Sequence, residues 1–483
     1  MSVKPLAVLL GVLVLPLVLE AQQEPTKPET KPETKPSSKP LPPFKDEVLG
    51  SDKDRPTPKE LSEFVKLVRG GSDAQLSPQD RKALMDKMAN WLVYRITWPD
   101  IQEGRDPGLT MAHIVEGISH QPGILPPYPG VAPRITGDPE RPMKWSDWNG
   151  ALTAIPTLDK DPATRKAQQQ YLDEFYPIML SRLRQVMQNR QLIARINAAR
   201  LLARWAEVGK QEVLDELVAI IEDPRESDAV RLWAFKGLGD LFDQLAHDPK
   251  FRKLLASSDA QAQAQRQKID RAVQLIFEWV YKRSQTMKSD LDAMSPAEVD
   301  GIRYVRREAL RALGKTHRPM LIEHKELNEE RKEVFKREGP IALMLLEFMV
   351  ANENIAPAPS WRERVEAAAG LLAMDPRISP TYQQDYAAHQ IGNFVVALVA
   401  AAAGDSKSDY WKYYAWYLLD AINAKTDVPR SEYFKKVMAR VVPVLDSLRT
   451  QESVPSADPL RQWLQDNPPP KGATALYVPP LED

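Results

Sequence analysis

The residues whose spacing best suits chemistry are two histidines and a glutamate. His113, Glu116 and His120 would project within about 60° of one another on a helix, so they could converge on one metal ion. Three carboxylates precede them: Asp100, Glu103 and Asp106. Gly117 weakens a helix here, and such a combination arises by chance in a chain of 483 residues. We therefore predict no metal site and keep this cluster as an alternative.

No familiar catalytic motif accompanies the cluster. The sequence holds no HExxH, GxSxG, P-loop or GxGxxG pattern. Cysteine is absent, which excludes disulfides, thiolate metal sites and a cysteine nucleophile. The six histidines are scattered: His113, His120, His247, His317, His324 and His389. We predict a protein that is not an enzyme, with no catalytic residue and no cofactor.

The numbers of acidic and basic residues indicate whether a nucleic acid is to be expected as a partner. Lys and Arg number 65 against 66 Asp and Glu, which leaves a formal net charge of −1. A nucleic-acid-binding protein is usually strongly basic, so we expect no nucleic-acid partner. The hydrophobic content of 43% is enough for a packed core.

The N-terminus has the pattern of a secretory signal over residues 1–21. Lys4 is followed by an apolar stretch from Leu6 to Leu19, which is short for a membrane span, and Ala21 suits the position before cleavage. The bulky Leu19 weakens the cleavage motif, so an uncleaved anchor is the alternative. We expect a secreted or periplasmic protein of the cell envelope, with no membrane insertion once the signal is removed.

The next segment, residues 22–56, has the composition of a linker. It includes the sequence PTKPETKPETKPSSKPLPP, which has almost no apolar side chain to bury. Frequent proline favours extended polyproline II, so this segment is predicted to be a disordered, semi-rigid spacer.

From residue 57 onward the chain is patterned as successive helices. Thr57-Pro58-Lys59-Glu60 and Ser295-Pro296-Ala297-Glu298 have the form of capping boxes with proline at the first helical position. Apolar residues return at helical spacing, and no alternating run is long enough to indicate a sheet. The predicted helices are 58–69, 78–96, 109–119, 163–188, 190–207, 210–222, 228–246, 260–286, 296–314, 325–337, 340–352, 360–373, 380–403, 409–424, 430–448 and 457–466.

A proline-rich stretch, residues 118–150, interrupts the helices and ends near Trp145 and Trp148. A long irregular loop in a folded protein is functional, disordered or a packed crossover. We use it as a boundary between an N-terminal helical region, 57–150, and the main body, 151–450. A proline-rich tail, 451–483, follows.

One short pattern recurs five times in the main body: a basic residue, an alanine three positions later and a leucine four positions after that. The copies are Arg195–Ala198–Leu202, Arg231–Ala234–Leu238, Arg306–Ala309–Leu313, Arg364–Ala367–Leu371 and Lys412–Ala415–Leu419. Alanine and leucine four apart share one helix face, and a small residue there lets a neighbouring helix approach closely. Repetition of such a unit predicts an array of stacked helices.

The segment from Glu212 to Gly239 resembles a HEAT repeat, a member of the armadillo-type helical solenoids. Asp223 closes its first helix, and Val230-Arg231 lies early in its second. The resemblance implies that Arg231 bonds back to the turn that contains Asp223. It also implies an all-α, irregular right-handed solenoid with a smaller helical N-terminal part. Because the five copies do not share one period, an irregular all-α domain without superhelical order is the alternative.

An aromatic run, residues 410–417, has two interpretations. Tyr410, Tyr413, Tyr414 and Tyr417 share a helix face, with Trp411 beside it. We expect this face to be core or a helix contact. The alternative is an exposed patch that binds peptide or sugar.

Solenoids of this kind expose long concave surfaces, and members of the family commonly serve as protein-binding scaffolds. We therefore expect an exported, non-enzymatic scaffold with a protein partner, an expectation that rests on fold analogy. The alternatives are a metal-dependent or other hydrolase with its site in residues 98–150, and a cell-wall or carbohydrate binder.

Overall fold

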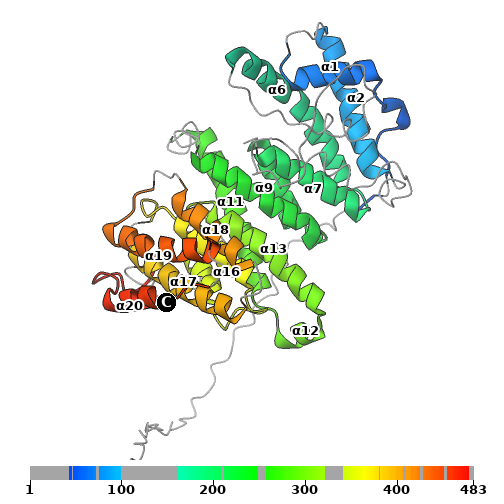
Figure 1. Ribbon diagram of the computed structural model, residues 1–483. Coiled ribbons are helices and arrows are strands. Elements are labelled where there is room, and N and C mark those ends of the chain that lie inside the picture. Colours follow the sequence, from blue (N-terminus) through cyan, green and yellow to red (C-terminus); the bar gives the residue numbers. More distant parts are fainter. Residues whose placement is uncertain are drawn as a thin grey trace, which may run out of the picture. The chain divides into compact units, whose positions relative to one another are not determined.

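The computed structural model describes residues 43–45, 47–71, 76–98, 161–207, 211–247, 257, 259–320, 341–379, 381–405, 410–424, 428–450 and 454–477. Residues 44–483 form one compact unit, to which the following description applies. Across its described parts the secondary structure is helical, with three isolated β-bridges and no strand (Figure 1). The prediction of an all-α fold is confirmed.

The described helices agree with the predicted ones to within four residues at most ends. The α-helices are α1 Pro58–Val68, α2 Pro78–Thr97, α6 Pro162–Val186, α7 Leu192–Glu207, α8 Leu214–Glu222, α9 Asp228–His247, α11 Ala260–Arg283, α12 Lys288–Ala293, α13 Pro296–Gly314, α15 Ile341–Val350, α16 Trp361–Ala373, α17 Gln384–Gly404, α18 Tyr410–Asn423, α19 Glu432–Thr450 and α20 Asp458–Asp466. Two short 3-10 helices are η1 Asp52–Asp54 and η2 Gln211–Val213.

Local cap chemistry accounts for the best-predicted helix starts. Both predicted capping boxes are present, at Thr57 and Ser295, and Ser360 forms another with Glu363. In each, the hydroxyl accepts from the backbone N–H three residues on, and the glutamate carboxylate accepts from the cap residue's own N–H. Unpaired N–H groups at the helix start are thereby satisfied.

Two predicted boundaries differ from the structure by three or four residues for a physical reason. Helix α17 starts four residues later than the predicted 380, because the Gln383 N–H donates to the Leu476 carbonyl and Tyr382 pairs with Tyr477. Helix α11 ends at Arg283, and the separate helix α12 follows it. The Ser284 hydroxyl there donates to the Val280 carbonyl, and the Ala356 N–H donates to the Ser284 carbonyl.

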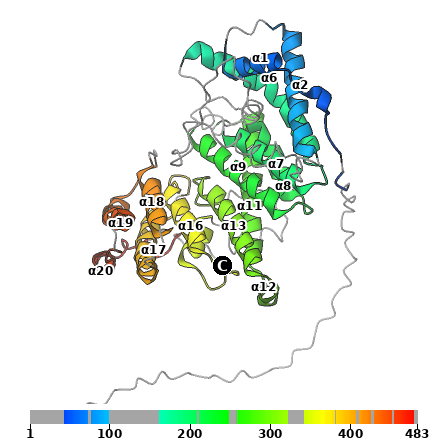
Figure 2. The ribbon, with the colours of Figure 1, turned by 45° about the vertical axis from the view of Figure 1, so that its right-hand side comes forward.

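The repeated alanines and leucines lie in the core. All five alanines are fully buried, and the five leucines are buried as well. Helix α7 packs against α9, α9 against α13, α13 against α16, and α16 against α18 (Figures 1 and 2). The backbones approach so closely that a Cβ added to Gly314 would lie 2.7 Å from the Gly370 Cα atom. Small residues therefore do set the spacing of these helices.

Four of the five basic residues in the pattern bond to the end of a preceding helix. The Arg231 guanidinium donates to the Asp223 carbonyl at 2.6 Å, as the HEAT resemblance implies. Arg195 donates to the Asn189 carbonyl and Arg364 to the Met349 carbonyl, while Arg306 donates to the Arg283 carbonyl. These bonds satisfy carbonyl groups that a helix end leaves unpaired. The fifth, Lys412, is exposed on α18.

Two of these arginines, Arg195 and Arg306, also bond forward along the chain. Arg195 pairs with Glu226 at 3.0 Å, and Arg306 pairs with Glu363 at 2.6 Å. Both side chains of the Arg306–Glu363 pair are completely buried. The carboxylate of each pair lies beside the start of the next long helix in the packing order, α9 or α16. Successive helix pairs are thus joined by charge as well as by apolar packing. We call Arg195, Arg231, Arg306 and Arg364 the anchor arginines.

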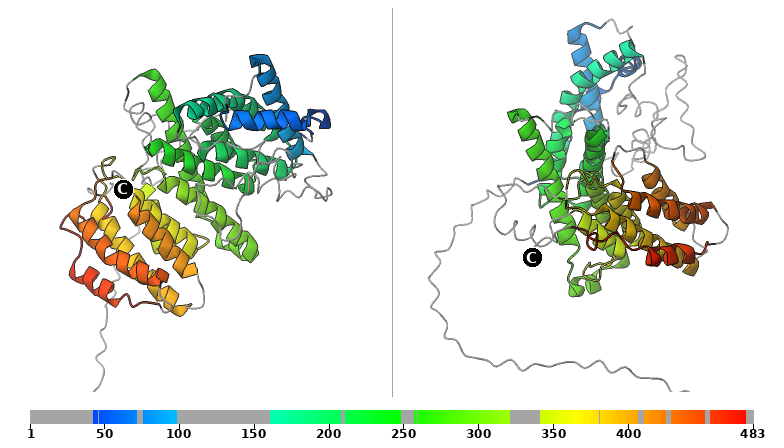
Figure 3. Two further views of the ribbon diagram at one scale, coloured as in Figure 1. Left: turned by 45° about the horizontal axis from the view of Figure 1, so that its top comes forward. Right: turned by 90° about the vertical axis from the view of Figure 1, so that its left-hand side faces the viewer.

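The N-terminal helices belong to the same core. Helices α1 and α2 pack against α6 (Figure 3, left). Phe64 is in edge contact with Tyr171 and Phe175. Part of the predicted linker also packs here. The Phe44 ring lies 4.0 Å from the Arg195 guanidinium, and Lys45 exchanges backbone hydrogen bonds with residues 188 and 190.

The chain's later part folds back on the middle. Helix α20 packs on α17, and the Tyr477 hydroxyl donates to the Pro319 carbonyl at 2.8 Å. The Ala342 N–H donates to the same carbonyl. Residues 476 and 477 therefore lie beside the segment that follows α13.

Among the described residues, one helix, α17, has the length and apolar composition of a membrane span. Half of its most apolar window is buried, and the helix packs against α19 and α20. The predicted signal, residues 1–21, and the predicted helices 109–119 and 325–337 lie outside the described residues.

Candidate functional site

The metal-like cluster recognised in the sequence, His113, Glu116 and His120, lies outside the described residues. So do Asp100, Glu103 and Asp106, and almost all of the 98–150 region proposed for a hydrolase site. The described part of the chain presents a different candidate, at the ends of α9 and α13.

An open cavity of about 710 Å³ lies among α9, α13, α16, α18 and α19. The lining comes from the later turns of α9, α13, α16 and α18 and from the first part of α19, and its apolar members include Ala369, Gly370, Leu372, Ala421, Met438 and Val442. Gly314 and Gly370 lie against each other in this lining, so the absence of two side chains contributes to its depth.

A buried ionic network forms one wall. Arg311 donates to the Glu366 carboxylate at 2.5 Å and to the Glu308 carboxylate at 3.0 Å. The Tyr417 hydroxyl donates to Glu366 as well. Burial acts to lower the pKa of Arg311, but the two carboxylates outweigh it and raise that pKa above its usual value. These groups satisfy one another, so their role in the cavity is to fix its shape and charge pattern.

A second cation, Arg430, lines the cavity from the segment before α19. It donates to the carbonyls of Leu372 and Met374 at the end of α16, and its guanidinium lies over the Phe434 ring at 4.6 Å. Burial lowers the pKa of Arg430 from its ordinary value.

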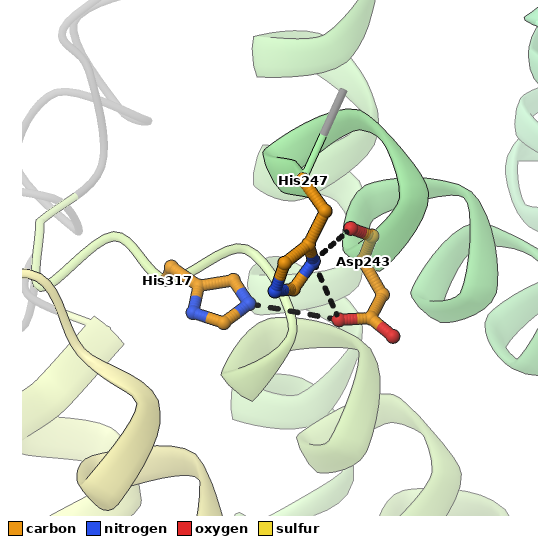
Figure 4. A group of neighbouring side chains, drawn as sticks. All are labelled: Asp243, His247 and His317. Atoms are coloured by element: carbon orange, nitrogen blue, oxygen red, sulfur yellow. Dashed lines mark hydrogen bonds and ion pairs between the residues drawn. The ribbon is translucent and has the colours of Figure 1, made fainter. Parts of the chain in front are cut away.

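Three further polar side chains meet at the cavity wall (Figure 4): Asp243 and His247 from the last turns of α9, and His317 from the segment after α13. The Asp243 Oδ1 atom lies 3.5 Å from His247 Nδ1 and 3.7 Å from His317 Nε2. One ligand-type atom from each residue lies within 4.8 Å of the other two. We call these residues the Asp–His–His cluster.

Backbone carbonyls orient both rings of this cluster. His247 Nδ1 lies 2.7 Å from the Asp243 carbonyl, and His317 Nδ1 lies 2.9 Å from the Ala373 carbonyl. A carbonyl oxygen only accepts, so each Nδ1 carries the proton in these bonds. His317 Nε2 is then a buried nitrogen with no hydrogen-bond partner within the described structure.

The Asp–His–His cluster also contains a strained backbone residue and a carboxylate with a lowered pKa. His317 has φ +56°, a left-handed conformation that is uncommon for a residue other than glycine. Burial acts to raise the pKa of Asp243, but His317, Lys315 and His247 together hold it below its usual value. The Asp243 carboxylate is therefore ionised at neutral pH.

Sequence reasoning missed this cluster, although one signal was present. Asp243 and His247 are four residues apart on a helix and share a face. His317 is far away in sequence, and only the packing of α9 on α13 brings it to them.

The aromatic run on α18 divides between core and solvent. Trp411 and Tyr414 are buried, as expected of a core face. Tyr410 and Tyr413, expected on the same face, are 58% and 52% exposed, and Trp416 is exposed beside Tyr413 with ring centroids 5.7 Å apart. The correction follows from helix geometry, because the buried face is centred on Trp411, Ala415 and Leu418.

Comparison of the chain with models of known protein families found no match, and comparison with curated proteins found none either.

Proposed function

We propose that this protein is an exported, non-enzymatic interaction module, built as a HEAT-like array, that holds a segment of a partner protein in the cavity among α9, α13, α16, α18 and α19. The observation that carries the proposal is the cavity itself. Five helices from a long stretch of chain line it, as expected for the inner surface of a stacked-helix array.

The lining has the character of a protein-binding site. Apolar side chains form much of it, and charged groups of both signs lie among them. Interfaces of this composition use apolar contact for affinity and charge for orientation. Because Arg311, Glu308 and Glu366 are paired with one another, they suit recognition better than proton transfer.

The HEAT-like part of the proposal is supported by the anchor arginines. Four copies of the pattern bond to a preceding helix end, and the bond from Arg231 to the turn at Asp223 is the one that the family resemblance implies. Irregular spacing between the copies fits insertions within single units, such as α12 between α11 and α13.

Crosslinking in cells tests the binding site. A photoreactive residue is placed at Lys435, on the cavity rim, and in a second chain at Arg449. The two positions match: both lie on α19, both are exposed, and each makes a surface ion pair three residues away. We expect a partner protein to be captured from position 435 and not from 449. Equal capture at both positions, or none at 435, would contradict the proposal.

A second candidate function rests on the exposed aromatic residues of α18. Tyr413 and Trp416 present adjacent rings to solvent, an arrangement that suits a sugar ring. If the protein binds cell-wall polysaccharide, it should sediment with insoluble wall material, and the W416A variant should not. The exposed Y304A variant, on α13, serves as the control.

A further inference from the structure

We propose that Asp243, His247 and His317 bind a divalent transition-metal ion of the zinc type at the cavity wall. This inference goes beyond the proposed protein-binding function and does not depend on it. The two residues from α9 and the one after α13 would then be cross-linked by the ion.

The donor set is the first argument. Imidazole nitrogen and carboxylate oxygen are ordinary zinc ligands, and a set of two histidines with one carboxylate is typical of sites that keep an open position. The three side chains are already gathered: their ligand-type atoms lie within 4.8 Å of one another.

The orientation of the rings is the second argument. Histidines that bind metal through one nitrogen commonly donate the other ring N–H to a carbonyl or carboxylate. Both rings do this here, His247 to the Asp243 carbonyl and His317 to the Ala373 carbonyl. The Nε2 atom of each ring is then the one available to a metal ion.

The third argument is a buried ring nitrogen that has no hydrogen-bond partner in the described structure. His317 Nδ1 is engaged with the Ala373 carbonyl, and His317 Nε2 lies 3.7 Å from Asp243 Oδ1, too far for a hydrogen bond. His317 Nε2 is thus buried without a hydrogen-bond partner in the described structure, with the Asp243 carboxylate as its nearest charged neighbour in the cluster. A cation between them satisfies both. Lys315, the nearby ammonium group, is engaged with Asp240 at 2.6 Å.

The exposure of two of the three residues gives an ion access to the cluster and leaves room for the ligands to adjust. The His247 side chain is 52% exposed and Asp243 is 41% exposed, so an ion can enter and the His247 ring can turn toward it. His317 is 13% exposed and is held in a left-handed conformation that costs free energy. A rigid ligand and a mobile one together let the site close around an ion. Because all three residues line the cavity, the open coordination position would face its interior.

Zinc titration of the full chain, without a polyhistidine tag, tests the proposal. Calorimetry with Zn²⁺ alone should show a site that weakens at least about tenfold in D243N, H247A and H317N, since loss of even a supporting contact costs 10–100-fold. Asparagine tolerates positive φ, so H317N keeps the backbone of this segment. Cobalt(II) in place of zinc should give a visible absorption that these variants lose.

Two controls make the result specific. H389A removes a histidine whose Nδ1 is engaged with the Tyr433 hydroxyl, and it should bind zinc as the parent does. The double variant H113A/H120A should also bind as the parent does. Melting curves without metal identify any variant that is merely unfolded, and H247A, altered at an exposed side chain, should melt with the parent.

The proposal is overturned if the parent chain binds no zinc at micromolar concentrations, if the three variants bind it as the parent does, or if binding is lost only in H113A/H120A. Crosslinking from position 435 in metal-free protein reports on the partner site separately, so the two proposals fail independently.

Discussion

Helix α9 carries polar residues of two different kinds at its two ends. In its first turn, Arg231 is bonded to the Asp223 carbonyl and to Asp228. In its last turns, Asp243 Oδ1 lies 3.5 Å from His247 Nδ1 and 3.7 Å from His317 Nε2. The first arrangement is closed and largely buried, while the second is open and half exposed.

The difference separates residues that hold the fold from residues available to a ligand. A buried charge is tolerated only when it is paired and hydrogen-bonded, and three of the anchor arginines, Arg195, Arg231 and Arg306, each have a carboxylate partner. The Asp–His–His cluster instead has a strained backbone at His317, a feature that costs stability and tends to persist at functional sites. Substitutions at the two sites should therefore differ in kind.

The largest effect is expected for R306A. Arg306 and Glu363 are both completely buried, so the change leaves a carboxylate without its cation and should lower the free energy of unfolding by about 3–5 kcal/mol. Urea denaturation measures it. R303A, on the same helix, removes a partly exposed side chain that pairs with Asp300 and donates to the Ala358 carbonyl, and it should cost about 1 kcal/mol. Similar losses in both variants would mean that the anchor network is not structural.

Next comes E308Q, whose effect should depend on pH. Burial acts to raise the pKa of Glu308, but Arg311 and Arg307 hold it below the usual 4.5. The carboxylate therefore stabilises the fold above about pH 4.5, and that stabilisation is lost as pH falls through the lowered pKa. At pH 7, E308Q should be about 1.5–3 kcal/mol less stable than the parent.

The pH dependence distinguishes charge from packing in this variant. The gap in urea midpoint between E308Q and the parent should narrow steadily as the pH is lowered from 5 toward 3. A gap that stays constant over this range would show that Glu308 acts through its shape rather than its charge.

A smaller effect is expected at the helix crossing that underlies the cavity. In G314A the new methyl group would lie 2.7 Å from the Gly370 Cα atom, so α13 and α16 must separate at a cost of about 1–3 kcal/mol. The matched control is G301A on the same helix, where nothing lies within 4 Å. That control should stabilise the protein by up to about 1 kcal/mol, because alanine is the better helix former. Equal melting temperatures for the two variants would rule out the close contact.

The smallest effect on stability should come from H247A. The side chain is 52% exposed, so the free energy of unfolding without metal should change by about 0.5 kcal/mol or less. A loss comparable to that of R306A would place His247 among the structural residues and remove the contrast between the two ends of α9.

The parts of the fold that could be predicted are those decided by neighbours in sequence. The helix that begins at Ser295-Pro296 was predicted at both ends, because its capping box, its proline and its apolar spacing are all local. The burial of Ala309 and Leu313 followed from the repeat pattern for the same reason. The start of α17 was missed because its preceding residues pair with residues 476 and 477.

The candidate site shows the same limit more strongly. A search by spacing finds only groups that lie on one helix, which is why His113, Glu116 and His120 drew attention. Asp243 and His247 also share a helix face, but two groups at this spacing are common and carry little weight alone. His317 gives the pair its significance, and its position depends on how α13 packs on α9. A contact between residues so far apart in sequence cannot be recognised from a short segment of neighbouring residues.

The bond between Tyr477 and Pro319 can form only late in synthesis of the chain. The two residues are separated by 158 positions, and synthesis at 5–20 residues per second puts Tyr477 on the order of ten seconds behind Pro319. The Pro319 carbonyl accepts hydrogen bonds from the Ala342 N–H and the Tyr477 hydroxyl, and before Tyr477 is made the Ala342 N–H is the one available. The segment that carries His317 is thus held by its last long-range bond well after α9 has been made. In a newly synthesised chain, the Tyr477–Pro319 bond is therefore among the last contacts of this segment to form.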